Sequence, residues 1–103
     1  MGQIVKLRVR ISLRASRDIN EIKDYLIERD PTAAEKVRQH ILRAIDLVSE
    51  YPLVGPKTEI SDVRVKLVKP FPYRIYYRVT AGFLDILHVR HMARQVPGPD
   101  EIV

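Results

Sequence analysis

The stretch from residue 63 to residue 94, VRVKLVKPFPYRIYYRVTAGFLDILHVRHMAR, decides the fold of this chain of 103 residues. Apolar and polar residues alternate in two runs, at residues 63–67 and 73–79, and a third, mostly apolar run at residues 83–90 returns as a strand. This period of two residues is typical of half-buried β-strands. Two prolines separate the first pair of runs, and Thr80-Ala81-Gly82 predicts a tight hairpin turn between the second pair. The stretch therefore predicts a three-stranded antiparallel meander.

Positive charge is concentrated on the same stretch. Its one acid, Asp85, stands against Arg64, Lys66, Lys69, Arg74, Arg78, Arg90 and Arg94. Most other acids of the chain fall between residues 18 and 50, so the later cations are largely uncompensated. Strands that only built a core would not need this charge. It suits an anionic partner, which is either nucleic acid or an acidic protein segment.

The first half of the chain predicts one further strand and two helices. Residues 5–13 alternate strictly and predict a strand. Ser16 is a candidate N-cap for a helix that ends near Asp30, because the residue before a proline is disfavoured in a helix. A second helix begins at Pro31, since proline is favoured at the first helical position, and it ends before Pro52.

These elements predict an α+β fold in the order β-α-α-β-β-β. An N-terminal strand precedes a helical hairpin, and the meander completes one sheet with the helices on one face. We expect a single domain over residues 1–94, with a loop at residues 52–61. Residues 95–103, QVPGPDEIV, predict an irregular tail.

Composition excludes several classes of protein. The chain has no cysteine, so it has neither a disulfide framework nor a thiolate metal site. It has no apolar run near the roughly 20 residues of a membrane span, and its start lacks the apolar region of a signal peptide. We therefore expect a cytoplasmic protein without membrane contact. His88 and His91 should point to opposite faces of a strand, so we expect no metal site and no cofactor.

A set of residues between positions 15 and 94 carries a resemblance to a known family. They are Ala15, Asp18, Ile19, Ile22, Tyr25, Pro31, Ala34, Pro52, Gly55, Arg64, Leu67, Tyr73, Arg74, Ile75, Tyr77, Arg78, Val79, Ile86, Leu87, Val89, His91 and Arg94. In order and spacing they resemble RelE/ParE-superfamily toxins of type II toxin–antitoxin systems, and the ParE branch more than the RelE branch. The resemblance implies a small toxin that is neutralised by a cognate antitoxin, whose disordered arm wraps it. ParE-like members poison DNA gyrase, whereas RelE-like members cleave mRNA on the ribosome.

The residues help to choose between these two activities. RNA cleavage needs a base, an acid and fixed positive charges around the phosphate. A catalytic set could be drawn from Arg64, Arg74, His91 and Arg94. RelE-like toxins add, in many members, a tyrosine near the C-terminus, and QVPGPDEIV contains none. This difference favours a gyrase inhibitor that acts by binding and is no enzyme, with an mRNA endoribonuclease as the alternative.

The candidate surface for an antitoxin or another anionic partner lies on the strands. It consists of Arg64, Lys66, Arg74, Tyr76, Arg78, Arg90 and Arg94. Tyr73 and Tyr77 fall on the apolar face of their strand, whereas Tyr76 falls on the polar face and is the better contact residue. Arg64 could instead pair with Asp62 or Asp85. Direct binding of nucleic acid is disfavoured, because no helix combines a basic face with the spacing of a recognition helix.

Overall fold

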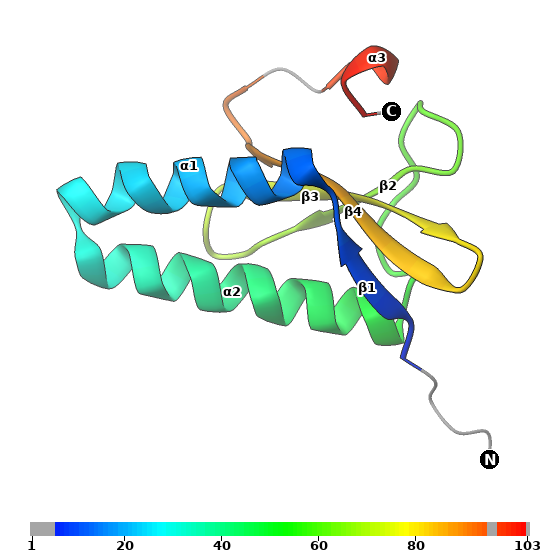
Figure 1. The fold of residues 1–103 in the computed structure, drawn as a ribbon, viewed down its shortest axis with the longest axis horizontal. Helices are drawn as coiled ribbons and strands as arrows, with labels where there is room; N and C mark the ends of the chain where they lie inside the picture. The colour runs from blue at the N-terminus through cyan, green and yellow to red at the C-terminus, as the bar shows by residue number, and fades with distance from the viewer. Residues whose placement is uncertain (1–5, 95–96, 103) are drawn as a thin grey trace.

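A computed structural model describes residues 6–94 and 97–102 of the chain. Its elements follow in the order β1 (Arg8–Ile11), α1 (Leu13–Arg29), α2 (Pro31–Glu50), β2 (Arg64–Leu67), β3 (Tyr73–Thr80), β4 (Phe83–His91) and α3 (Pro99–Ile102) (Figure 1). The predicted α+β class and the order β-α-α-β-β-β are confirmed. The short α3 lies within the segment for which the sequence predicted an irregular tail.

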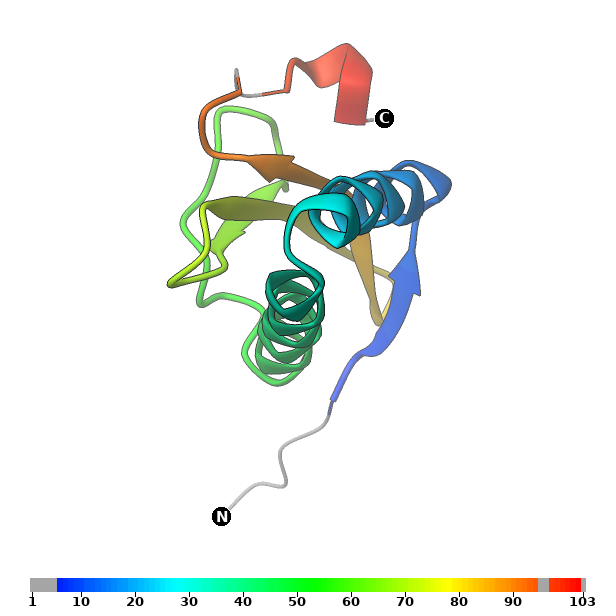
Figure 2. The ribbon, with the colours of Figure 1, turned by 90° about the vertical axis from the view of Figure 1, so that its left-hand side faces the viewer.

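The four strands form one mixed sheet in the order β1-β4-β3-β2. β2, β3 and β4 make the predicted antiparallel meander, and β1 runs parallel to β4. Ala81 and Gly82 both have positive φ, at 50° and 83°, as a two-residue hairpin turn requires. The helical hairpin of α1 and α2 packs on one side of the sheet, and α3 lies on the side away from α2 (Figure 2).

Asp30 forms the corner between the two long helices. Its backbone N–H donates to the carbonyl of Leu26, which ends α1. Its side chain accepts a hydrogen bond from the N–H of Ala33 at 3.2 Å, and Pro31 stands at the first helical position. The predicted end of the first helix and start of the second are therefore confirmed.

The prediction for the first strand and its following helix was wrong in its boundaries. The predicted strand covered residues 5–13, whereas β1 spans Arg8–Ile11; residue 5 lies outside the described part of the chain. The N-cap is Ser12 instead of Ser16, because the Oγ of Ser12 accepts a hydrogen bond from the N–H of Ala15 at 3.0 Å. Leu13 continues the alternation of the strand in sequence but lies in the first turn of α1.

The main core lies between the sheet and the helical hairpin. Its buried members are Ala15, Val37, Ile41, Ala44, Ile45, Val48, Val68, Tyr73, Ile75, Tyr77, Leu84, Ile86 and Val89. Tyr77 also fixes the loop that follows α2. Its hydroxyl accepts a hydrogen bond from the N–H of Gly55 at 3.0 Å and donates to the carbonyl of Pro52 at 2.8 Å.

The other face of the sheet carries a second, smaller apolar cluster. Val63, Tyr76 and Leu87 are its buried members, and Ile60 and Val65 pack against them. The register of β3 and β4 shifts after Tyr76, so that Leu87 is passed over in the pairing as in a β-bulge. Both faces of the sheet therefore bury side chains.

Among the described residues, none of the helices has both the length and the apolar character needed to cross a membrane.

We predict that Gly55→Ala destabilises the fold. A Cβ atom at residue 55 would lie 2.5 Å from the carbonyl oxygen of Val65 and 2.7 Å from the hydroxyl of Tyr77. The backbone must shift to relieve this clash, at a cost of about 1–3 kcal/mol. Chemical denaturation measures the loss. Gly98→Ala is the matched control, because a Cβ there meets no atom within 4 Å. Equal stability of the two variants would contradict the assigned role of Gly55.

Candidate functional site

A hollow of the described surface, here called the α1–β4 groove, has a volume of about 630 Å³. It lies between α1, the connection that precedes β3, and the end of β4. Its lining is Arg14, Asp18, Glu21, Ile22, Tyr25, Leu26, Ala33, Val37, Phe71, Pro72, Tyr73, His88, Val89, Arg90, His91, Ala93 and Arg94. The groove thus joins an apolar floor to several arginines.

Asp18 is the acid on which one wall of this groove depends. It lies in the second turn of α1 and is buried. Its Oδ2 accepts a hydrogen bond from the backbone N–H of Val89 at 3.0 Å, and its Oδ1 lies 3.3 Å from the Nε of Arg14. The same Oδ2 lies 2.7 Å from the Nδ1 of His88, although the atoms are not aligned as a hydrogen bond. One carboxylate therefore ties α1 to β4.

His88 is buried in its neutral form between Asp18 and Arg90. Its side chain is 1% exposed. The Nη2 of Arg90 lies 3.1 Å from its Nε2, and because a guanidinium only donates, Nε2 must accept and the proton resides on Nδ1, facing Asp18. Burial lowers the pKa of His88 below its usual value of 6.5; Asp18 opposes this shift, and the nearby Arg90 and Arg14 reinforce it.

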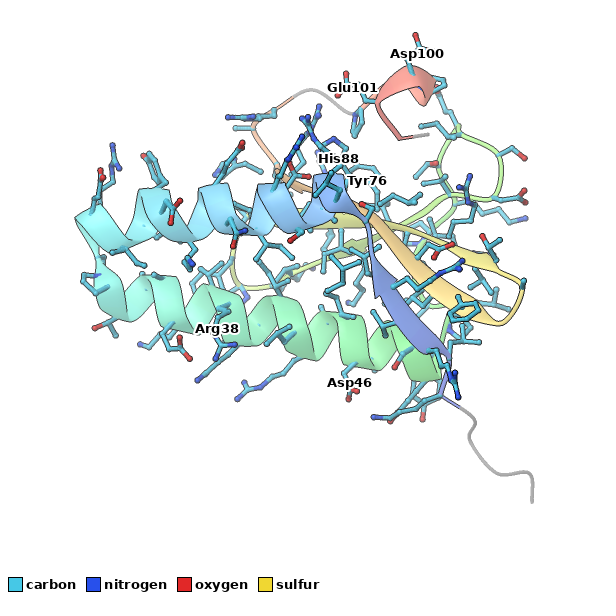
Figure 3. All side chains as sticks on the ribbon, viewed as in Figure 1. Arg38, Asp46, Tyr76, His88, Asp100 and Glu101 are labelled. Atoms are coloured by element: carbon cyan, nitrogen blue, oxygen red, sulfur yellow. The ribbon has the colours of Figure 1, made fainter. Side chains whose placement is uncertain are left out.

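Arg90 extends this chain of contacts to α3. Its Nη2 donates to the Oε2 of Glu101 at 2.5 Å, and the charge and hydrogen bond of Arg90 lower the pKa of Glu101. Figure 3 shows Glu101 on α3 above the end of the sheet that carries His88. The contacts therefore run from Asp18 through His88 and Arg90 to Glu101.

The structure divides the site residues that the sequence suggested between two ends of the sheet. His91, Arg90 and Arg94 line the α1–β4 groove. Arg74 pairs in register with Arg90 on the neighbouring strand, and its Nη1 lies 3.5 Å from the carbonyl oxygen of Met92. These residues belong to one region.

Arg64 belongs to the other region. Together with Arg78 it lines a second hollow, near the loop after α2. Its Nη1 donates to the carbonyl of Gly55 at 2.8 Å. The suggested pairing with Asp85 was wrong, since Asp85 binds Arg10 at 2.7 Å instead. Arg64 therefore holds the loop that follows α2 and lies outside the α1–β4 groove.

Two further candidates are placed differently from each other. Lys66 lies on β2, half-buried and opposite Ile75 of β3. The prediction that Tyr76 is a surface contact was wrong, because it is 2% exposed and packs between Val63 and Leu87. Its face of the strand is polar in sequence but is covered in the fold.

Sequence reasoning missed the roles of Asp18, His88 and Glu101. Asp18 was named only among the residues that carry the family resemblance. One signal was available, because Asp18 lies between Ala15 and Ile22 on the apolar stripe of α1, where an acid needs a partner. No local pattern marks Glu101, whose partner is eleven residues away.

Comparison with known proteins shows the family of this chain. Residues 9–96 match the family described as the ParE toxin of type II toxin–antitoxin systems, parDE. The chain therefore belongs to the ParE toxin family, which lies within the wider RelE/ParE superfamily.

Two curated relatives and two solved structures illustrate the range of similar proteins. The chain is 38% identical over 90 residues to the putative toxin Y4kP of Sinorhizobium fredii, covering 87% of this chain and 93% of that protein. It is 36% identical over 81 residues to toxin RelE2 of Caulobacter vibrioides, covering 79% and 90%.

The structural matches share the fold at lower identity. A chain of the chromosomal ParDE toxin–antitoxin system from P. aeruginosa superposes with a TM-score of 0.76 at 20% identity, covering 84% of this chain and 96% of that chain. A chain of the toxin–antitoxin complex RelBE2 from Mycobacterium tuberculosis gives 0.59 at 23% identity, covering 89% and 98%. These likenesses support the shared fold.

We predict that the protein becomes less stable as the pH is lowered, because of His88. The folded state holds this group neutral with a lowered pKa, so the unfolded chain takes up the proton first as the pH drops below about 6.5. The free energy of unfolding should fall by up to about 1.4 kcal/mol per pH unit in this range. Denaturation between pH 7.5 and pH 5 measures the slope.

The variant His88→Gln should flatten this slope, because it removes the titrating group. His40→Gln is the control, since His40 lies on α2, away from Asp18 and Arg90, and contacts Phe71. An equal slope in the wild type and in His88→Gln would contradict the assignment.

Proposed function

We propose that this protein is a ParE-like toxin that inhibits DNA gyrase by protein–protein binding and is neutralised by a cognate antitoxin. The membership in the ParE family supports this proposal. We further propose that it acts in the cytoplasm, where gyrase is found.

The observation that carries the proposal is that Arg64, one of the four residues suggested for RNA cleavage, lies apart from Arg74, His91 and Arg94. The cations Arg64 and Arg74 belong to different regions, and Arg64 is bound to a loop carbonyl. His88 could move protons, but it is buried beneath Arg90. Cleavage requires a base, an acid and phosphate-binding cations around one reacting phosphate. Protein–protein inhibition requires none of this chemistry.

The α1–β4 groove is the surface that best fits the antitoxin. Its floor contains the partly buried side chains of Ile22 and Leu26, and apolar floors of this kind receive amphipathic segments. Arg14 and Arg94 stand at the groove as exposed cations. An acidic amphipathic segment would match both features, because complementary charge speeds and orients association.

The second candidate function is mRNA cleavage on the ribosome. It is favoured by the similarity to toxin RelE2 and by the meeting of His91 and Arg94 in the groove. In that case His91 would shuttle protons and Arg94 would hold the phosphate. The Nδ1 of His91 accepts a hydrogen bond from the N–H of Ala93 at 2.9 Å, which leaves its Nε2 as the donor.

We predict that the purified protein abolishes DNA supercoiling by gyrase at stoichiometric excess. Inhibition should disappear when the protein encoded by the adjacent open reading frame is added, since that protein is the expected antitoxin. A supercoiling assay on relaxed plasmid measures both effects. Undiminished gyrase activity, together with new 5′ ends on translated messages, would overturn the proposal in favour of mRNA cleavage.

We also predict that Arg94→Glu weakens binding of the antitoxin by about tenfold, because it places a like charge beside an acidic segment. Titration calorimetry with the adjacent gene product measures the change. Arg43→Glu is the matched control, since it alters the net charge equally on an exposed position of α2 outside the groove. An equal loss in both variants would mean that only net charge matters and that the groove is not the docking site.

A further inference from the structure

We propose that the C-terminal segment of this chain is an internal competitor of the antitoxin, with Glu101 occupying the carboxylate site at Arg90. The inference rests on the proposed antitoxin in one respect, the acidic partner that would displace Glu101. The site itself stands on the contacts of Arg90.

Arg90 has the features of a preorganised site that binds a carboxylate. Its side chain is only 12% exposed, whereas that of Glu101 is 50% exposed. Contact with the Nε2 of His88 at 3.1 Å holds the guanidinium in place, and His88 is in turn fixed by Asp18. A cation that is oriented in advance loses little freedom when a carboxylate binds it. Glu101 shows that a carboxylate reaches this position.

The site is continuous with the α1–β4 groove. Arg90 lines the groove together with Arg14 and Arg94, so an acidic segment lying there would meet all three cations. Glu101 approaches the same guanidinium from α3. A partner carboxylate and Glu101 cannot both occupy one oriented Nη2, so binding of the first displaces the second.

The competitor is held weakly enough to be displaced. α3 has only four residues, and the backbone N–H of Glu101 bonds locally to the carbonyl of Gly98 at 3.1 Å. An ion pair with one half-exposed partner contributes little to stability. Pro97 is buried, so the segment stays close to the site when Glu101 leaves it. The C-terminal segment therefore lowers the apparent affinity of the protein for an acidic partner, and the loss depends on the fraction of molecules in which Glu101 occupies Arg90.

The test compares two variants that remove the same charge from adjacent residues. Glu101→Gln removes the carboxylate bound to Arg90, whereas Asp100→Asn removes an exposed carboxylate for which the described residues provide no ion pair. The probe is a fluorescently labelled hexaglutamate peptide at low salt, and its anisotropy gives the dissociation constant with the full chain. Glu101→Gln should bind the peptide about three- to tenfold more tightly than the wild type, and Asp100→Asn within about 1.5-fold of it.

A double-mutant cycle with Arg90→Gln locates the effect. The Arg90→Gln variant should bind the peptide more weakly, and adding Glu101→Gln to it should give no further change. Circular dichroism and thermal unfolding confirm that each variant is folded. Equal affinities of Glu101→Gln and Asp100→Asn would overturn the inference, as would weaker binding by Glu101→Gln or wild-type affinity of Arg90→Gln.

This experiment is independent of gyrase and of the antitoxin itself. A protein that leaves supercoiling unchanged but shows the predicted peptide affinities would refute gyrase inhibition and keep the competition. A protein that inhibits gyrase but binds the peptide equally in both charge variants would keep the proposed function and refute the competition.

Discussion

The incompletely paired edge of β4 is the constraint on which the rest of the structure depends. β1 pairs with β4 only from Phe83 to Ile86, and the edge continues beyond it. The Oγ of Ser12 donates to the carbonyl of Leu87, and Asp18 accepts from the N–H of Val89. Because buried backbone groups must be paired, α1 has to cross this edge with Asp18 turned inward. That crossing makes the wall of the groove, so the fold and the candidate site have the same cause.

The regular elements could be predicted because their signals are local. Asp30 and Pro31 mark a helix boundary by their own chemistry, and the alternation of residues in β3 follows from the two-residue period of a strand. The start of α1 was misplaced because Ser12 fits both a strand pattern and a cap. No local pattern revealed that Tyr76 is covered, since Leu87 of β4 and Val63, which precedes β2, come from other parts of the chain. Burial of the second face is a property of the assembled sheet.

Positive charge counted along the chain overstates what is available to a partner. Arg10 is bound by Asp85 and lies over the ring of Phe83, while Arg64 holds a loop carbonyl. The placement of each cation therefore matters more than the sum. The number of positive charges could be counted from the sequence, but the partners of these arginines come from distant segments. The site was for this reason less predictable than the fold.

The occupied state of Arg90 has a consequence for how a partner gains affinity. Arg90 binds a carboxylate before and after the exchange, so replacing Glu101 by an acid of the partner changes the electrostatic energy little. The net gain must then come from apolar contacts on the groove floor, where Ile22 and Leu26 lie. Acidic ligands without an apolar face would bind more weakly than amphipathic ones, because they bring no apolar contact to offset the lost contact with Glu101. The C-terminal segment thereby favours an amphipathic acidic segment over a ligand that is only anionic.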